Sequence, residues 1–304
     1  MVITMNKPDQ PSEKKRNPLV SVIIPTYKRP KKLQRAIESV VEQTYKNWEL
    51  IVVNDHPECD VRDRLPDHDA IRYVHHDDNQ GAPTARNNGI KRSEGKFVAF
   101  LDDDDEWDSK KIEQQVAVFN NSYDSLGVVY TGTEVRRCNN RTYNSANKKD
   151  NLTKKLLKEN FVGTLSSVLV RRSIIEQVGG FDIRFPSWQD KEWYIRLSQY
   201  CEFKPVNKYL TIRHMTGDDH ISDDFEQLSE NTYPLFINKF GNLARSFGYR
   251  YYRQWRSICA QNVSGYALRL NHATEARAYA TRAIFWYPFQ HQSYINIVKS
   301  LYME

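Results

Sequence analysis

Residues 97–107 read FVAFLDDDDEW, an apolar run that passes directly into four consecutive carboxylates, Asp102 to Asp105. The run has the length and composition of a buried strand, so the carboxylates are expected just past its carboxyl end. Four like charges this close repel one another, and Mg²⁺ or Mn²⁺ bound by one or two carboxylates and by phosphate oxygens relieves that repulsion. The stretch therefore predicts a site for a metal ion and a diphosphate. Its alternative interpretation is a solvated acidic turn that caps the helix expected near Ser109.

The segments on either side of this stretch alternate between strand and helix. Runs rich in β-branched residues predict strands at residues 20–24, 48–53, 71–74 and 126–131. Apolar residues at helical spacing predict helices at residues 33–41, 82–92 and 112–119. Such alternation is typical of an α/β fold with a mostly parallel sheet, whose ligands bind beyond the carboxyl ends of the strands. Thr26, Asp55 and the four carboxylates follow three different strands, so we expect them along one rim.

The second half of the chain predicts further elements and a change of fold class. Residues 138–160 are polar and rich in Asn and Lys, which favours a loop or a flap. Strands are expected at residues 165–170, 203–206 and 209–213, and helices at 172–178 and 190–199. Beyond about residue 224 the pattern is helical throughout. We therefore expect a disordered leader at 1–17, an α/β catalytic domain at 18–224 and a helical region at 225–304.

Composition excludes several classes of protein. The sequence contains no apolar stretch approaching the roughly 18 residues that a membrane span needs. The N-terminal tail lacks the apolar segment of a secretory signal, and the four cysteines form no CxxC pair, so we expect a cytoplasmic protein without disulfides or a zinc site. The net charge of +6 is modest, and the basic residues are spread along the chain. Because no nucleic-acid-binding motif is recognisable, we expect no nucleic-acid partner.

Five stretches resemble one family when they are taken in order: VSVIIPTYKRP (20–30), QTYKNWELIVVND (43–55), NQGAPTARNNGIKRSEGKFVAFLDDDDEW (79–107), VGGFD (178–182) and WQDKEWYIRL (188–197). Together they resemble glycosyltransferase family 2, inverting enzymes of the GT-A fold, over roughly residues 19–215. The resemblance implies a nucleotide-diphospho-sugar transferase with a Rossmann-like mixed sheet, followed here by a C-terminal helical extension. It also implies Mn²⁺ or Mg²⁺ as cofactor and a nucleotide sugar, with a UDP-sugar favoured, as donor.

The resemblance assigns residues to the nucleotide base. In the family, the loop after the first strand and the acid after the second hold the base, which here implies Pro25, Thr26, Tyr27 and Asp55. The face of Tyr27 can stack on a pyrimidine, and a carboxylate can accept a hydrogen bond from its ring N–H. The alternative for Tyr27 is a packing aromatic at the rim. The family usually has two acids after the second strand, whereas this chain has Asn54 before Asp55.

The resemblance also assigns the acidic run, which matches the family's DXD-type motif. It implies that Asp104 is a direct metal ligand, that Asp102 contacts the ribose or a metal-bound water, and that Asp103 belongs to the same nucleotide-sugar site. Arg86 matches a pocket arginine that holds the nucleotide. The alternative for Arg86 is a helix-surface arginine paired with an acid.

The general base implied by the resemblance is Asp190. An inverting transfer needs one carboxylate to remove the proton of the acceptor hydroxyl while that hydroxyl attacks the anomeric carbon. Many members have Glu-Asp here, whereas this chain has Gln189 before Asp190. Alternatively, Asp190 caps its helix. The acceptor pocket is expected to be flanked by Gly180, Phe181, Asp182 and Trp188.

Two histidines follow the last predicted strand, in IRHMTGDDHIS at residues 212–222. His214 and His220 lie where related enzymes carry a loop that closes over the donor. We assign His220 as a candidate ligand of the metal ion, and leave open whether either histidine contacts the metal ion or the diphosphate or is simply exposed to solvent.

The helical region has an unusual charge balance. Residues 241–304 hold eight Lys and Arg residues against two acidic residues, with aromatic residues between them. Such segments suit peripheral contact with an anionic membrane surface, where a lipid-linked acceptor would be found. The alternative is a helical hairpin packed on the catalytic domain.

The sequence therefore predicts a metal-dependent inverting glycosyltransferase that uses a nucleoside-diphosphate sugar and a hydroxyl of a glycan or lipid-linked acceptor. Two other functions remain as alternatives. A sugar nucleotidyltransferase would share the α/β layout and the metal ion, and a non-catalytic nucleotide-sugar-binding module would share the donor site.

Overall fold

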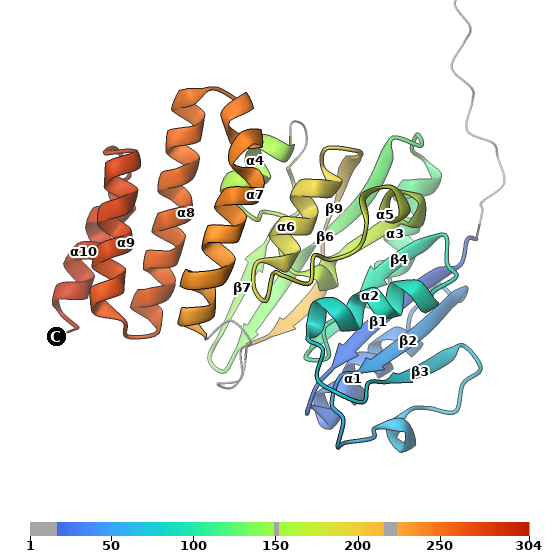
Figure 1. Cartoon of the computed structure of the whole chain (residues 1–304). Helices are drawn as coiled ribbons and strands as arrows, with labels where there is room; N and C mark the ends of the chain where they lie inside the picture. The colour runs from blue at the N-terminus through green and yellow to red at the C-terminus, as the bar shows by residue number, and fades with distance from the viewer. Residues whose placement is uncertain (1–16, 149–151, 216–223, 304) are drawn as a thin grey trace, which may run out of the picture.

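The computed structural model describes residues 17–148, 152–215 and 224–303 (Figure 1). Its strands are β1 (Val20–Thr26), β2 (Trp48–Asn54), β3 (Ile71–His75), β4 (Phe97–Phe100), β5 (Asp105–Trp107), β6 (Leu126–Arg137), β7 (Asn140–Asn144), β8 (Val168–Arg171) and β9 (Glu202–His214). Within the described ranges they form a nine-stranded sheet in the order β3-β2-β1-β4-β8-β6-β9-β5, with β7 paired to β6. Strands β1 to β4 are parallel, whereas β8 is antiparallel to both neighbours. The sheet is therefore parallel in its first half, as predicted, and mixed beyond β4.

The α-helices are α1 (Pro30–Val41), α2 (Ala82–Arg92), α3 (Lys111–Asn120), α4 (Leu152–Lys158), α5 (Arg172–Val178), α6 (Gln189–Leu197), α7 (Tyr233–Ser246), α8 (Tyr249–Arg269), α9 (Ala273–Trp286) and α10 (His291–Leu301). Helices α7 to α10 stand side by side in chain order, away from the β1 to β3 end of the sheet (Figure 1). Across the described ranges, no helix combines the length and the apolar character needed to cross a bilayer.

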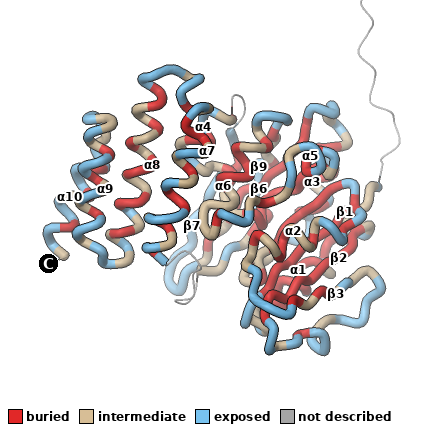
Figure 2. The backbone as a smooth tube through the Cα atoms, viewed as in Figure 1, coloured by how far each residue is buried: buried red, intermediate tan, exposed pale blue. Residues whose placement is uncertain are grey.

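Apolar residues of the sheet enter two cores, one on each face. Ile23 of β1 joins the core that contains α2 and α6, whereas Val22 and Ile24 join the core that contains α1 and α3. This division follows from the strand geometry, because successive side chains of a strand point to opposite faces. The central strands are buried along their length (Figure 2). Both faces of the sheet are thus covered, as the alternation of strands and helices predicted.

The C-terminal helices pack directly on the α/β part. Phe236 of α7 and Trp255 of α8 belong to the same core as Trp193 of α6. Beside Trp255 on α8, Gln254 Oε1 accepts a hydrogen bond from Lys158 Nζ over 2.8 Å. These contacts favour the packed helical arrangement among the two interpretations of the tail.

Three segments differ from the sequence-based expectation. The predicted loop at residues 138–160 contains β7, which pairs with β6, and α4; the side chains of β7 are all exposed, so the strand carries no apolar alternation. The strand expected at residue 165 begins at Val168, because residues 165–167 form a 3₁₀ turn capped by Thr164. The strands expected at 203–206 and 209–213 form the single strand β9, in which shifts of register against β6 absorb the residues between them.

Candidate active site

The carboxyl ends of β1 and β4 bring Thr26 and the acidic run together. The two strands are neighbours in the sheet, with Ile23 opposite Phe100. Thr26 Oγ1 donates a hydrogen bond to Asp103 Oδ2 over 2.8 Å. These two segments therefore meet at one rim of the sheet.

Arg29 occupies the space between two of the carboxylates. Its Nη1 atom lies 3.4 Å from Asp103 Oδ1 and 3.0 Å from Asp104 Oδ2. Arg29 precedes α1 and was not among the predicted site residues. The signal available in the sequence was its place in the loop after β1, directly before Pro30.

The acidic run holds more negative charge than its partners balance. Burial raises the pKa of Asp103 to about 6, opposed by the hydrogen bond from Thr26 and reinforced by the charge of Asp104. Burial also raises the pKa of Asp105 well above its usual value, and the charges of Asp102 and Asp104 add to the rise. Asp105 Oδ2 accepts from Ser166 Oγ over 2.6 Å, while its buried Oδ1 has no hydrogen-bond partner within the described part of the chain. An additional cation would relieve this excess of negative charge.

The donor atoms in this run fit a particular kind of cation site. In the described ranges, no three His, Cys, Asp or Glu side chains form a group that could hold a metal ion by themselves. Mg²⁺ commonly binds through one or two carboxylates together with substrate phosphates and water, without a protein cage. The residues of the run fit that open type of site.

Asp55 lies past the end of β2, and protein donors already engage its carboxylate. Oδ1 accepts from the backbone N–H of Gln80 at 2.9 Å and lies 2.7 Å from His76 Nδ1, while Oδ2 accepts from the backbone N–H of Gly81 at 2.7 Å. These contacts tie the start of α2 to β2. A carboxylate has about four acceptor positions, so Oδ2 keeps one for a further donor. The role of Asp55 in base binding stays a prediction.

Tyr27 is placed differently from its neighbours Pro25 and Thr26, which are buried within β1. The residue is 37% exposed, and its ring centroid lies 5.1 Å from that of His56. The exposed part of the ring leaves an aromatic surface at the rim, beside the ends of β1 and β2.

Arg86 connects the acidic run to the start of α6. Its Nη2 donates to Asp102 Oδ1 over 2.7 Å and its Nη1 donates to Gln189 Oε1 over 2.7 Å. The side chain is almost fully buried between them. Of the alternative interpretation, the structure confirms that Arg86 is paired with an acid. It contradicts the placement of Arg86 on the outer surface of the helix.

Asp190 lies in the first turn of α6 and is held at both oxygens. Oδ2 accepts from Asn160 Nδ2 and Oδ1 accepts from the backbone N–H of Lys191, each over 2.7 Å. Burial raises the pKa of Asp190, opposed by the Lys191 N–H and by the charges of Arg213 and Arg86. The residue before α6 that positions this turn, Trp188, has a left-handed backbone with φ of 57°, which is strained for a bulky side chain.

The VGGFD segment (residues 178–182) contacts α2, α6 and α7. Asn87 of α2 makes two hydrogen bonds of 2.8 Å with the backbone of Phe181, and a Cβ at Gly180 would overlap the Asn87 side chain. Lys239 of α7 lies 2.6 Å from Asp182, whose pKa is lowered chiefly by its hydrogen bonds with Arg184.

These contacts give the predicted acceptor residues very different surroundings. Phe181 is buried against Trp193. Of the four, Trp188 alone borders the cavity of about 460 Å³ that opens beside Asp190. Acceptor binding by the other three stays a prediction.

Of the two candidate histidines, only His214 lies among the residues that the structure describes. His214 Nε2 lies 2.9 Å from Glu106 Oε1, and burial lowers its pKa, with the charge of Arg35 adding to the fall. His214 is thus a partner of Glu106 on the β9 to β5 edge. His220 lies outside the described residues, and its role as a metal ligand stays a prediction.

Comparison with known proteins places the chain in a family. The profile described as Glycosyl transferase family 2 matches residues 21–179, more than half of the 304 residues. The chain belongs to glycosyl transferase family 2. Its similarity to individual members is limited in extent. TuaG of Bacillus subtilis (strain 168), a putative teichuronic acid biosynthesis glycosyltransferase, is 39% identical over 103 residues, which are 33% of this chain and 41% of TuaG.

A second family 2 relative is aligned over a longer segment. WfgD of Escherichia coli, named UDP-Glc:alpha-D-GlcNAc-diphosphoundecaprenol beta-1,3-glucosyltransferase, is 30% identical over 182 residues, which are 59% of this chain and 69% of WfgD. The chain therefore spans less than half of TuaG and about two thirds of WfgD.

Solved structures resemble almost the whole chain. TarS 1-349 of S. aureus in complex with UDP-GlcNAc has 15% sequence identity and a TM-score of 0.57, covering 91% of each chain. The mannosyltransferase PcManGT of Pyrobaculum calidifontis, in complex with GDP-Man and Mn²⁺, has 16% identity and a TM-score of 0.55, covering 94% of this chain and 86% of that one. At these identities the likeness concerns the fold. The protein has the GT-A fold with a C-terminal helical region, as the sequence predicted.

Two positions of this family 2 glycosyltransferase depart from the acids common in the family, and both have other partners here. Asn54 Nδ2 donates to Cys59 O over 2.6 Å and to Tyr73 Oη over 3.1 Å, which holds the loop after β2. The Gln189 Oε1 atom accepts a hydrogen bond from Arg86 Nη1 over 2.7 Å. Both departures are visible in the sequence, but the hydrogen bonds that Asn54 and Gln189 make could not be predicted from it.

Proposed function

We propose that this family 2 glycosyltransferase moves a sugar from a nucleoside-diphosphate sugar to a hydroxyl of a glycan or lipid-linked acceptor, with inversion at the anomeric carbon. The observation that carries the proposal is the Arg86 bridge, because one guanidinium binds Asp102 of the acidic run and Gln189 beside Asp190. The bridge fixes the base relative to the donor side. Direct displacement depends on such positioning, since the base, the hydroxyl and the anomeric carbon must align.

Asp190 is the general base of this proposal. The acceptor hydroxyl attacks the anomeric carbon, its proton passes to an Asp190 oxygen, and the nucleoside diphosphate leaves from the opposite face. The hydrogen bonds from Asn160 and from the Lys191 N–H orient the carboxylate. The burial that raises the pKa of Asp190 also makes its carboxylate a stronger base.

The acidic run is the proposed cation site. A bound Mg²⁺ or Mn²⁺ would stabilise the negative charge that develops on the leaving diphosphate. Asp104 would hold the ion directly, Asp102 would contact the ribose or a metal-bound water, and Arg29 would add positive charge beside them. The excess of negative charge in the run supports this assignment, as does the Mn²⁺ bound with GDP-Man in the PcManGT complex.

We favour a uridine-linked donor. TarS 1-349 has been solved with UDP-GlcNAc and with UDP, and WfgD is named as a UDP-Glc transferase. The exposed ring of Tyr27 offers a face on which a pyrimidine stacks. Pro25, Thr26, Asp55 and Asp103 complete the proposed donor site around it.

The outer face of α10 supports peripheral contact with an anionic membrane. The inward face of this helix is polar, with Ser293, Asn296 and Ser300 buried. Its exposed apolar residues recur at helical spacing: Tyr294, Ile295, Val298, Leu301 and Tyr302. An exposed apolar face within a basic region suits an anionic lipid surface. In addition, the name of WfgD specifies a diphosphoundecaprenol-linked acceptor, which is lipid-linked.

Vesicle sedimentation tests the membrane proposal. We expect the full-length protein to bind phosphatidylglycerol vesicles, with binding that weakens as salt rises, because screening removes the attraction between basic residues and anionic lipid. The double variant Ile295→Gln/Val298→Gln should bind more weakly than the control variant Ser293→Ala, which changes the buried face of the same helix. Well-folded protein that ignores such vesicles at every salt concentration contradicts the proposal.

Product analysis tests the reaction itself. Nucleotide sugars are first screened with Mg²⁺ or Mn²⁺ for a donor-dependent rise in melting temperature, since a ligand that binds only the native state stabilises it. The donor found is then incubated with the enzyme. Release of nucleoside diphosphate supports glycosyl transfer, whereas release of pyrophosphate indicates a nucleotidyltransferase. Donor binding without turnover in the presence of any candidate acceptor indicates a non-catalytic module.

A further inference from the structure

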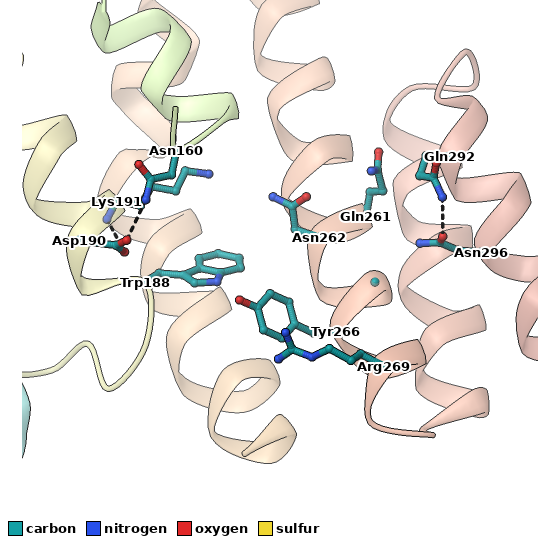
Figure 3. A pocket seen from close by; sticks show the side chains of 11 residues that line it. Asn160, Trp188, Asp190, Lys191, Gln261, Asn262, Tyr266, Arg269, Gln292 and Asn296 are labelled. Carbon is teal, nitrogen blue, oxygen red and sulfur yellow. Dashed lines mark hydrogen bonds between the residues drawn. The ribbon is translucent and has the colours of Figure 1, made fainter. Parts of the chain in front are cut away.

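A cavity of about 460 Å³ lies between the start of α6 on one side and helices α8 and α10 on the other (Figure 3). Asp190 and Trp188 line it on the α/β side. Asn262, Tyr266 and Arg269 line it from α8, and further lining residues come from α10. The proposed base therefore faces a space whose opposite wall belongs entirely to the helical region.

The α8 wall presents one continuous face. Asn262, Tyr266 and Arg269 are four and three residues apart, which places them on the same side of a helix. The Tyr266 and Trp188 side chains approach the cavity from opposite walls (Figure 3). Aromatic faces with amides beside them match the chemistry of a sugar ring, since apolar C–H faces stack on the rings while hydroxyls exchange hydrogen bonds with amides.

The charge of the lining points to one class of sugar. Arg269 lies over the Tyr266 ring, 4.6 Å from its centroid, and Lys191 is a second basic residue of the lining. Asp190 is the single acidic residue among the described residues that line the cavity. Because burial lowers the pKa of Lys191, the exposed Arg269 is the basic side chain that gives positive charge to this space, which also offers polar and aromatic contacts.

We infer that this cavity is the acceptor site and that it takes a saccharide bearing a phosphate or a carboxylate, selected by α8. The inference rests on the proposed function, because it places the accepting hydroxyl beside Asp190. Trp188 and Tyr266 hold the ring, Asn262 binds its hydroxyls, and Arg269 meets the anionic group. Acceptor choice is thereby assigned to a region outside the segment that matches the family profile.

Gly265 offers a way to fill the cavity without disturbing the fold. It borders the cavity on α8, and a Cβ at this position meets no atom within 4 Å. Glycine is also a poor helix former, so replacing it favours the helix. Gly265→Phe should therefore block the cavity. Ala278→Phe, on the exposed face of α9, is the matched control for added bulk outside the cavity.

The test measures binding of three probes to the full-length protein by saturation-transfer NMR in the presence of UDP and Mg²⁺. The probes are methyl β-glucoside, methyl β-glucuronide and glucose 6-phosphate. We expect at least one charged probe to bind about tenfold more tightly than the neutral one, because hydrogen bonds to charged groups are the stronger ones. The charged probe that binds more tightly identifies the anionic group as carboxylate or phosphate.

Variants decide where the probes bind. Gly265→Phe should abolish probe binding, Ala278→Phe should leave it unchanged, and Arg269→Gln should remove the preference for charged probes while keeping the neutral one. Arg269 is exposed, so this variant remains informative if Gly265→Phe does not fold. Equal binding of all probes by wild type, no binding of any, probe binding that survives in Gly265→Phe, or a preference for charged probes that survives in Arg269→Gln overturns the inference. UDP affinity is measured in parallel by calorimetry. Wild-type protein that does not bind UDP contradicts the proposed function. Wild-type protein that binds UDP but none of the probes overturns only the acceptor site.

Discussion

The proposed donor side and the proposed acceptor side of this enzyme are built by different means. On the donor side, the acidic run has short contacts with Thr26 at the end of β1, with Arg29 before α1 and with Arg86 of α2. On the acceptor side, a cavity lies between α6 and helices that come much later in the chain, and amide and aromatic side chains line it. Nucleoside-diphosphate sugars share a diphosphate, whereas acceptors differ. Under our proposals, the contrast teaches that the shared chemistry resides at the sheet and that the variable chemistry resides in the added helices.

The largest effect is expected from Asp190→Asn, because Asp190 lies where the two sides meet. An amide cannot take the hydroxyl proton, so transfer should fall by about 10²–10⁴-fold, the range for loss of a general base. Donor affinity should stay unchanged, whereas stability should fall by about 1 kcal/mol, because an amide has one oxygen and leaves one of the N–H donors of Asn160 and Lys191 without its acceptor. Initial rates, calorimetry with UDP and thermal unfolding measure these quantities. Turnover close to wild type would show that Asp190 only caps α6.

Asp104→Asn tests whether the donor side acts independently of the acceptor side. Loss of a ligand that places the cation should lower transfer by about 10²–10³-fold, similar to removal of one electrostatic donor at a transition state. Excess chelator should have the same effect on wild type. Probe binding in the acceptor cavity should be unaffected, and the exposed Asp67→Asn variant is the matched control. Full activity in excess chelator would contradict the metal-dependent assignment.

Arg86→Lys tests the connection between the two sides. Lysine keeps the positive charge but cannot reach two acceptors in the fixed fork geometry of a guanidinium. We expect transfer to fall by about tenfold while UDP affinity changes less, because one charge-assisted hydrogen bond is lost from the positioning of α6. Steady-state kinetics alongside UDP titration separates the two. A fall in UDP affinity as large as the fall in rate would place Arg86 on the donor side alone.

The smallest effect is expected in the pH dependence of the rate. Burial raises the pKa of Asp190, opposed by the Lys191 N–H, Arg213 and Arg86. The base works only when ionised, so the rate should fall as pH drops through this raised pKa, above the ordinary Asp value of about 3.9. The shift also favours the folded state at low pH, and this stabilisation is lost as pH rises through the folded pKa. Rate profiles from pH 4 to 8 on a donor-saturated enzyme measure it, and a rate independent of pH down to about 4 would count against Asp190 as the base.

Most of the donor side could be predicted because its residues follow strands that periodicity reveals. The rim of Thr26 and the acidic run follows from two parallel strands, and α2 begins and ends at the residues expected. Arg29 and Ser166 were missed, because a lone basic or hydroxyl residue in a loop carries no periodic signal. Their positions depend on how loops from separate strands meet.

The acceptor side was less predictable for a related reason. Gly180, Phe181 and Asp182 form a motif in the sequence, yet their contacts are with Asn87 and Lys239 within the fold. The amides of α8 resemble ordinary helix residues, and only tertiary packing brings them opposite Asp190. Local patterns therefore identified the segment before α6 but not the wall that faces it.

The core shared by α6, α7 and α8 has a consequence for evolution and engineering. Because Trp193 packs in the same core as Phe236 and Trp255, the helices cannot be exchanged as a detachable module. A chain ending near residue 224 would expose the apolar side of α6, and the two parts should melt in a single cooperative transition. If α8 selects the acceptor as we propose, new acceptor specificity is reached more readily by point substitutions along α8 than by grafting another helical region.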